Sequence, residues 1–454
     1  MEIAASPKAT INVLATSITQ RLAYPYAFIS ISPSKKLNFT TLCCSAKPDT
    51  NTNSSTSSSN HTQNSHNNST PLSSNSISPS SSSRGLVFDL GISNSWDSKE
   101  IGSPVVKRFL SDEEERWYMW YHGNSGETPV SDSIGLAVSN NGIHWERGIE
   151  AVNSSGDVGL VMKKGENWWA FDTISVRPSE VIIMSSSKIR GSSAVYWLYY
   201  TGFSAEKIEF LSDVDSLKFN LQNPERFCNA ECFKSLPGLA MSQDGRHWAR
   251  IEGEHHSGAL FDVGTEKEWD CSFISNPQVV FHGSDDMRMY YHSFDREKGE
   301  FGIGIARSRD GIKWVKLGKI MGGGKIGSFD EKGVMNASVV RNKKDGSYVM
   351  AYEGVSGGDG KVRSIGLAVS SDGLKDWRRY GEDDDGNGVL KSEKDGWDSN
   401  GVGSPCLVQI EGDVDDEWRL YYRGVGIDGR SGIGMAFCFG NDFSTFQRWT
   451  GFPL

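Results

Sequence analysis

Three glutamates, Glu100, Glu180 and Glu353, lie where an internally repeated sequence changes from one repeat to the next. Residues shared by every repeat are expected to build the fold, whereas residues that differ at equivalent positions are expected to carry function. Because two carboxyl groups can serve as the acid and the base of one reaction, these glutamates are candidate catalytic residues. The alternative interpretation is that each is a solvated or salt-bridged carboxylate.

A second group of variable residues offers hydrogen-bonding groups to a ligand. The residue after a repeated aromatic pair is His, Thr, Glu or Arg, depending on the repeat, and at the same end of equivalent strands such residues could ring the mouth of a channel. Exposed strand ends are the alternative. Two adjacent tryptophans have no counterpart in other repeats and are candidate platforms for sugar stacking. The candidate binding residues are His122, Trp168, Trp169, Arg177, Asn276, His292, Asn336 and Arg423.

The repeat occurs five times after Gly85. Each unit opens with an aromatic residue and Asp, followed by a β-branched run, an aromatic strand and a strand of the type Ile-Gly-Leu-Ala. Because the aspartates are common to all units, we expect them to make structural hydrogen bonds at turns or strand starts. They are Asp97, Asp172, Asp270, Asp330 and Asp398.

Four units close with a tight turn and a tryptophan. Asn-Gly or Asp-Gly between alternating strands is a strong hairpin signal, because both residues tolerate positive φ. The tryptophan after the turn (Trp145, Trp248, Trp314 or Trp377) is expected to pack back on the preceding strand. Five units of four short strands predict an all-β fold, a five-bladed β-propeller over residues 85–454. A β-sandwich is the alternative, and the five-fold similarity argues against it.

This repeat style and length resemble the propellers of glycoside hydrolase families 43 and 32/68, the arabinanase, levansucrase and invertase superfamily. The resemblance covers residues 85–454 and implies three carboxylates on the inner strands around a central funnel. In the first and third units, Ser103-Pro104 and Asn276-Pro277 stand where those enzymes commonly have carboxylates. Neutral groups therefore replace two of the expected acids.

Two hypotheses for function follow. The resemblance implies a glycoside-hydrolase-like propeller that binds or acts on a carbohydrate or similar small polar molecule in its funnel. The neutral replacements favour instead a catalytically inactive propeller, a binding or assembly platform with a protein partner. No zinc signature, phosphate loop or Ser-His-Asp spacing is present, so no cofactor or metal is predicted. Cys228 and Cys232, within an insertion at residues 203–236, are interpreted as part of an ordinary loop, with a metal or redox site as the alternative.

The N-terminal region differs in composition from the repeats. Residues 3–48 lack Asp and Glu and are rich in Ser, Thr and Ala, so residues 1–48 are predicted to be a chloroplast transit peptide that delivers the protein to the stroma. Mitochondrial import is the alternative. Residues 49–84, mostly Ser, Asn and Thr, are predicted to be a disordered linker. The net charge of −10 argues against a nucleic-acid partner, and no apolar run is long enough to span a membrane.

Overall fold

The computed structural model describes residues 83–110, 114–184, 195–209, 231–283, 285–357, 363–381, 388–440, 442–444 and 446–451. The predicted transit peptide and nearly all of the predicted linker lie outside them, as do Cys228 and the side chain of Cys232. Every named element of the described residues is a β-strand, which confirms the all-β prediction. No helix within these ranges is long and apolar enough to cross a membrane.

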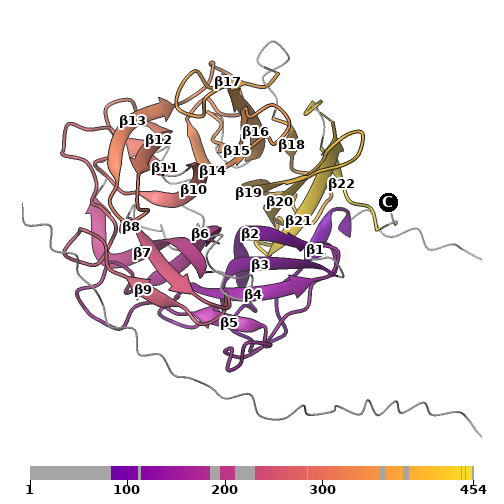
Figure 1. The fold of residues 1–454 in the computed structure, drawn as a ribbon, viewed down its shortest axis with the longest axis horizontal. Helices are drawn as coiled ribbons and strands as arrows, with labels where there is room; N and C mark the ends of the chain where they lie inside the picture. The colour runs from indigo at the N-terminus through magenta and orange to yellow at the C-terminus, as the bar shows by residue number, and fades with distance from the viewer. Residues whose placement is uncertain are drawn as a thin grey trace, which may run out of the picture. The chain divides into compact units, whose positions relative to one another are not determined.

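Five antiparallel sheets surround a common axis and form the five blades predicted from the repeats (Figure 1). Blade 1 contains β2 (Glu100–Leu110), β3 (Glu115–Asn124), β4 (Ser133–Ser139) and β5 (Gly159–Met162). Blade 2 contains β6 (Ser175–Met184), β7 (Val195–Glu209), β8 (Glu231–Ser242) and β9 (Ala249–Ile251). Blade 3 contains β10 (Ser275–Gly283), β11 (Asp286–Asp295), β12 (Glu300–Ser308) and β13 (Val315–Met321).

The last two blades are assembled less regularly. Blade 4 contains β14 (Val334–Arg341), β15 (Tyr348–Gly354), β16 (Ser364–Ser370), β17 (Arg378–Arg379) and β18 (Leu390–Lys391). Blade 5 contains β19 (Gly401–Ile410), β20 (Glu417–Val425), β21 (Ser431–Phe439), β22 (Gln447–Arg448) and the N-terminal strand β1 (Leu86–Phe88). Because β1 and β22 both pair with β21, the two ends of the propeller sequence meet in one sheet and close the ring.

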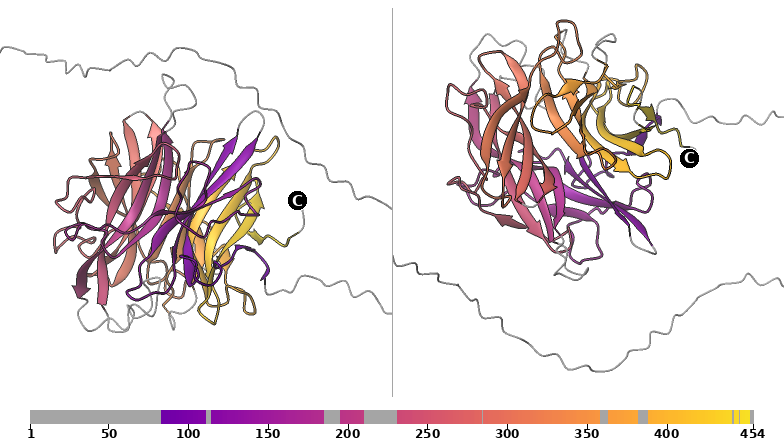
Figure 2. Two further views of the ribbon diagram at one scale, coloured as in Figure 1. Left: turned by 90° about the horizontal axis from the view of Figure 1, so that it is seen from below. Right: turned by 45° about the horizontal axis from the view of Figure 1, so that its top comes forward.

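The first strand of each blade lies next to the axis. These strands are β2, β6, β10, β14 and β19, and each contacts the first strand of the next blade (Figure 1). In blade 2 the second and third strands continue as a long hairpin, with pairing as far as Glu209 and Glu231 (Figure 2). The predicted insertion at residues 203–236 therefore begins as an extension of this hairpin. Its Ile208 packs in an apolar cluster with Phe273, Phe294, Phe301, Met335 and Val355.

The five repeated aspartates are structural, as the sequence predicts. Each accepts a hydrogen bond of 2.8–3.3 Å from a buried tyrosine on the second strand of its blade, such as Tyr121 for Asp97. Each also pairs with a cation from the outer part of the blade, at 2.7–3.4 Å. The cations are Arg147, Arg250, Lys316, Arg379 and Arg448. One construction thus recurs in all five blades.

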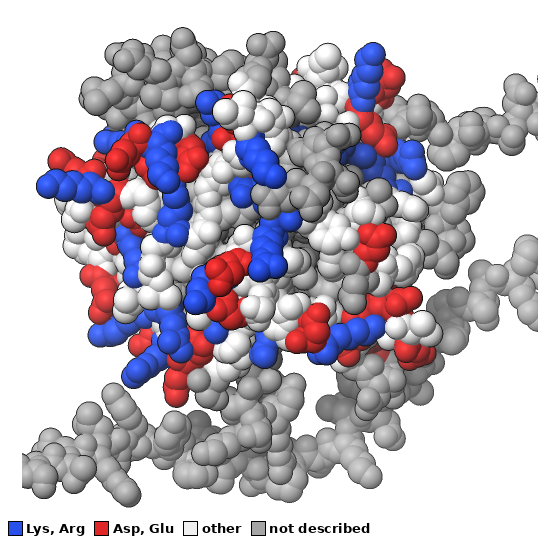
Figure 3. Space-filling view, turned by 90° about the horizontal axis from the view of Figure 1, so that it is seen from above, with Lys and Arg blue, Asp and Glu red and all other residues white. Residues whose placement is uncertain are grey.

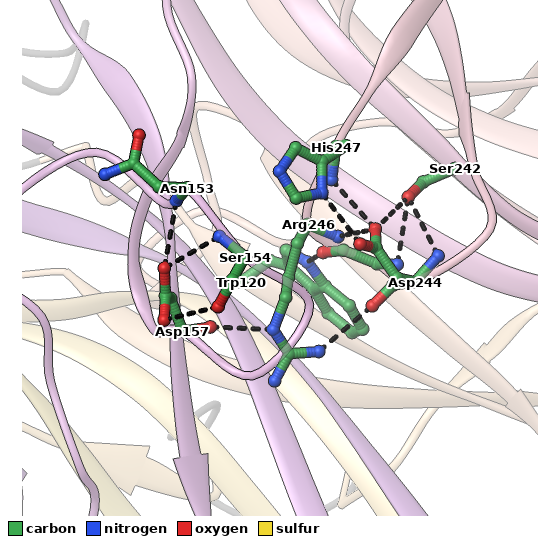
Figure 4. A network of polar contacts seen from close by, with 9 residues as sticks. Trp120, Asn153, Ser154, Asp157, Ser242, Asp244, Arg246 and His247 are labelled. Atoms are coloured by element: carbon green, nitrogen blue, oxygen red, sulfur yellow. Dashed lines mark hydrogen bonds and ion pairs between the residues drawn. The ribbon is translucent and has the colours of Figure 1, made fainter.

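The tryptophan after each turn shares an apolar cluster with the alanine of its preceding strand and also contacts the neighbouring blade. Trp248 packs edge-on against Trp120 of the preceding blade, with ring centroids 6.3 Å apart, and the other three make equivalent contacts. The indole of Trp120 also donates to the Gly245 carbonyl at 2.9 Å (Figure 4). Beside it, Arg246 donates to the Asp157 carbonyl of blade 1 at 2.7 Å. The turns therefore join neighbouring blades.

Candidate functional site

The channel is lined by a kink that recurs in the first strands. Ser103, Asn276, Asn336 and Ser404 have φ of 46–53°, a region that few residues other than glycine adopt, and the strand pairing shifts register there. Pro178 stands at the equivalent position of blade 2. All five residues line a cavity with an empty volume of about 350 Å³, part of it open to solvent. Among its lining residues, Glu180 is the one carboxylate.

The residues after the aromatic pairs do not form an exposed ring. His122, Thr201, His292 and Glu353 are all buried. Three of them accept a hydrogen bond from the backbone N–H of the kinked residue in the next blade. The bonds are Asn276 N to Thr201 Oγ1 (2.8 Å), Asn336 N to His292 Nδ1 (3.4 Å) and Ser404 N to Glu353 Oε2 (2.9 Å). We call each such bond a clasp.

These side chains are buried because the neighbouring first strand leaves room for them. Gly403 lies against the Glu353 carboxylate, and Gly102 lies against Arg423 and His122. A Cβ on Gly102 would lie 2.8 Å from His122 Cε1, closer than real Cβ atoms approach other atoms. The side chains therefore turn inward between the blades.

Two of the five positions cannot form a clasp. The residue that follows His122 around the ring is Pro178, which has no backbone N–H to donate. Arg423 precedes Ser103 around the ring, and a guanidinium carries donors only, so it cannot accept a backbone N–H. Both exceptions flank blade 1. Function is therefore sought on either side of this blade.

Ion pairs hold these two junctions. Arg423 of blade 5 donates to Glu100 Oε1 at 3.0 Å, and Arg177 of blade 2 donates to Asp132 Oδ2 at 2.7 Å. The amide of Asn124 joins the two pairs, since its Nδ2 lies 3.3 Å from Glu100 Oε2 and 2.8 Å from Asp132 Oδ1. We call this group the blade 1 cluster; it comprises Glu100, His122, Asn124, Asp132, Arg177 and Arg423.

The blade 1 cluster differs from the charged surface in its burial. On the outer side of the propeller shown in Figure 3, basic and acidic side chains are interspersed and exposed. In the cluster, the side chains of Arg177, Glu100 and Arg423 are only 8, 9 and 14% exposed. Burying charge is expensive unless it is paired, and the junction held by Thr201 shows that an uncharged acceptor is sufficient, so the four buried charges of this cluster call for a functional reason.

The protonation states of the cluster follow from these contacts. Burial opposes ionisation of Glu100, but His122 and Arg423 outweigh it and lower the pKa of Glu100 to about 2. Burial, aided by the charge of Arg177, lowers the pKa of His122. At neutral pH the cluster therefore contains an ionised Glu100 beside an uncharged imidazole.

The other two candidate glutamates have different surroundings. Glu353 pairs with Arg363 and accepts from Asn336 Nδ2 at 2.8 Å, in addition to its clasp with Ser404. Although burial opposes it, these partners lower the pKa of Glu353. Glu180 lies further along its strand than Arg177, where it pairs with Lys107 and accepts from Gln278 Nε2 at 2.7 Å. Both glutamates link blades through contacts already made in the fold.

The structure thus unites part of the predicted site. Glu100, His122, Arg177 and Arg423 lie together in the blade 1 cluster, while Asn276, His292 and Asn336 lie at the clasped junctions. Trp168 and Trp169 are 91 and 41% exposed and do not line the channel cavity. Their role as a stacking platform stays a prediction.

Two charged residues were missed by the sequence reading. Asp132 and Arg363 each stand two residues before the Ile-Gly of a third strand, where the other repeats have Ser235, Phe301 and Ser431. This position varies as much as those that were compared, so the same comparison applied to the third strands would have singled both out. Within the described ranges, no group of three or more His, Cys, Asp or Glu side chains could hold a metal ion.

Comparison with known sequences finds distant relatives that match part of the chain. No family model matches the chain. An uncharacterized protein of Mycobacterium tuberculosis is 28% identical over 213 residues, which are 45% of this chain and 61% of that protein. A 1,2-beta-oligomannan phosphorylase of a Thermoanaerobacter species is 26% identical over 188 residues, 41% of this chain and 52% of that protein. The chain thus spans between about half and three-fifths of the length of these curated relatives.

Solved structures share the fold over most of the propeller. A glycoside hydrolase has a TM-score of 0.52 at 14% identity and covers 82% of this chain and 94% of its own. An N-acetylgalactosamine deacetylase from F. plautii, in complex with blood group B trisaccharide, has a TM-score of 0.51 at 13% identity, with 80 and 96% covered. At these identities the likeness concerns the fold alone. The protein is a five-bladed β-propeller, a fold that it shares with these two structures.

Proposed function

We propose that the protein binds a carbohydrate at the blade 1 cluster and cleaves a glycosidic bond there. The observation that carries this proposal is the concentration of buried charge at the two junctions that lack clasps. Sugars present many hydroxyl groups, each of which both donates and accepts, and the arginines and carboxylates of the cluster can bind them in both ways. The relative that phosphorolyses an oligomannan supports the same class of ligand.

In the proposed reaction, Glu100 is the base. Its low pKa keeps it ionised at neutral pH, as a proton acceptor must be. It accepts the proton of the water that attacks the anomeric carbon, while the departing oxygen takes a proton from a second carboxyl group. Asp132 is the candidate for that group, because the distances to the shared Asn124 place its Oδ1 and Glu100 Oε2 at most about 6 Å apart. A pair that admits a water between its carboxyl groups needs about 6.5–9.5 Å, so the two must separate when the ligand binds. Asp132 is buried, so it reaches a ligand only if its pair with Arg177 opens.

The experiment is a turnover screen of the full chain with two arms. Oligosaccharides, including β-1,2-mannobiose, and aryl glycosides are incubated with and without inorganic phosphate, and the products are separated by chromatography. Free sugar in both arms indicates hydrolysis, and a sugar 1-phosphate in the phosphate arm indicates phosphorolysis. Glu100→Gln is expected to lower the rate by about 10²–10⁴-fold. An active protein whose Glu100→Gln variant keeps its full rate would contradict the site.

The inactive platform remains the second candidate because of one specific observation. The channel is lined by the four kinked residues and by Pro178 at the equivalent position, none of which carries a charge. If the screen finds no turnover while one of the sugars raises the melting temperature, this second function is supported and the enzymatic one fails.

We further propose the relationship to families 43 and 32 and the plastid location, which the motifs and the composition of residues 1–48 support. Fused to a fluorescent protein, residues 1–48 should direct it to chloroplasts. A cytosolic or mitochondrial signal would contradict this location.

A further inference from the structure

His122 is a buried side chain without a hydrogen-bond partner. It is completely buried, and neither ring nitrogen finds a partner among the described residues. Its Nε2 lies 3.7 Å from Glu100 Oε1, which is too long for a hydrogen bond. A buried polar group left unpaired typically costs about 1–3 kcal/mol. An apolar ring at this position would thus make the fold more stable.

The equivalent residues in other blades show what His122 lacks. Thr201, His292 and Glu353 each accept the N–H of the next blade, so burial of their polar atoms is compensated. The residue opposite His122 is Pro178, which has no backbone N–H, so His122 cannot accept such a bond. His122 therefore makes no clasp but still carries a polar, titratable ring. This makes it a candidate for a role that is specific to this junction.

The surroundings direct both His122 and Arg423 to the same oxygen. Gly102 leaves room for the two side chains, and Glu100 Oε1 lies 3.0 Å from Arg423 Nη2 and 3.7 Å from His122 Nε2. The side chain of Arg423 is 14% exposed, whereas that of His122 is 0% exposed. Arg423 is therefore the more accessible of the two side chains to a ligand.

We infer that His122 is a positioning residue that takes over Oε1 of Glu100 when a bound ligand draws Arg423 away; this rests on the proposed function of Glu100. The movement required of the carboxylate is small, because 3.7 Å exceeds a normal hydrogen bond by less than 1 Å. Hydrogen bonds of catalytic groups are often long before the substrate binds and shorten in its complex. The exchange keeps Glu100 in place while Arg423 serves the ligand.

The exchange also makes Glu100 a stronger base. Losing a cation at 3.0 Å and gaining a neutral donor stabilises the ionised carboxylate less, so its affinity for a proton rises when the ligand is present. Three charged groups act on His122: Glu100 from β2, Asp132 ahead of β4 and Arg177 from β6. Arg423 from β20 lies beside it and pairs with Glu100. Glu100 and Asp132 favour the protonated imidazole, whereas burial and Arg177 oppose it.

The experiment imitates the withdrawal of Arg423 without needing a substrate. The His122 imidazole is assigned in ¹⁵N spectra with the variant His122→Gln, and its pKa is followed by titration in the wild type and in Arg423→Gln. We expect the His122 pKa to rise in Arg423→Gln, because the imidazole now bonds Glu100. In the double variant Arg423→Gln/Glu100→Gln the His122 pKa should equal that of Glu100→Gln alone, because the rise depends on Glu100. Arg363→Gln, which removes a nearby arginine that pairs with Glu353, is the matched control and should leave the pKa unchanged.

The outcomes decide the inference independently of catalysis. An unchanged pKa in Arg423→Gln overturns it, and a rise that persists in the double variant over Glu100→Gln alone overturns it too, because lost repulsion alone would then explain the rise. If Arg423→Gln does not fold, Arg423→Met provides the same comparison with and without Glu100→Gln, and the same two outcomes overturn the inference. These pKa measurements need no substrate, so they test the inference even if the turnover screen finds no activity.

Discussion

The five junctions between blades fall into two groups at the end of the channel where the first strands begin. Between blades 2 and 3, 3 and 4, and 4 and 5, a side chain accepts a backbone N–H of the next blade. On either side of blade 1, ion pairs take the place of this bond. The fold shows that a short uncharged acceptor such as Thr201 is sufficient to hold a junction. The charges beside blade 1 are therefore better explained by a ligand than by stability.

The far ends of the junctions do not show this division. There the second-strand aromatics Trp120, Tyr199, Tyr290 and Tyr421 donate to a turn glycine of the next blade at 2.6–3.0 Å. Both junctions of blade 1 are among the four. The repeated contacts of blade 1 are therefore present at its far end and absent at the end where its first strand begins. The five-fold symmetry is broken at that end.

The largest expected effect comes from removing a whole blade. Deleting residues 396–454 removes the sheet in which β1 and β22 join β21, so four blades must close without a partner for β1. We expect the cooperative thermal transition to disappear, as measured by calorimetry and circular dichroism. A sharp transition near the wild-type temperature would contradict ring closure.

A smaller effect concerns the clasp of His292 and its dependence on pH. Burial lowers the pKa of His292 from 6.5 to about 4, so between these values the unfolded chain binds the proton more readily than the folded protein. Folding free energy contributed by the neutral ring is therefore fully present above pH 6.5 and is lost as the pH falls to about 4, a loss of about 3 kcal/mol.

Chemical denaturation of the wild type and of His292→Gln at several pH values measures this contribution. The stability difference between the two proteins should shrink on acidification through this window. A difference independent of pH would show that His292 is not held neutral in its clasp.

The next prediction concerns the loss of stability when one hydrogen bond is removed at the far end of each of two junctions. Tyr421→Phe and Tyr199→Phe each remove a hydroxyl that donates to a turn glycine, at 2.8 and 3.0 Å. Each should lower the free energy of unfolding by about 1 kcal/mol, and by similar amounts, because the far ends of the two junctions are alike. Urea denaturation is the measurement. A much larger loss in Tyr421→Phe would mean that blade 1 is held unusually at both ends.

The smallest effect is expected at His122. Because its ring makes no hydrogen bond in the described structure, His122→Phe should change the free energy of unfolding by less than about 0.5 kcal/mol or increase it. His292→Phe loses its clasp and should be destabilised by about 1–3 kcal/mol. Equal losses in both variants would contradict the distinction between clasped and unclasped junctions.

The fold could be predicted from the sequence because its elements repeat. The aspartates shared by all units and the Asn-Gly or Asp-Gly turns indicated the number of blades and the structural role of the repeated aspartates. The partner of Trp248 in the preceding blade could not be predicted, because a pattern within one unit does not show which blade lies beside it. Contact with Trp120 is a property of the closed ring.

The candidate site was predicted in part for a related reason. Variation between repeats pointed to His122, Arg177 and Arg423, and the structure brings them together with Glu100. It did not show that His292 and Glu353 turn inward to the next blade, since that direction depends on space left by residues such as Gly403 in a neighbouring strand. Pro178 carried the decisive information, because a missing N–H explains why His122 is free of the repeated role.

The central claim is that ligand chemistry belongs to Glu100 beside blade 1, whereas Glu353 serves a clasp. The most direct test measures kcat/KM per folded molecule for Glu100→Gln and Glu353→Gln with any substrate found in the screen. The account predicts a loss of about 10²–10⁴-fold for Glu100→Gln. For Glu353→Gln it predicts mainly a lower melting temperature, because the variant weakens the partnership with Arg363 and Ser404. Equal losses of turnover in the two variants, or a loss confined to Glu353→Gln, would contradict it.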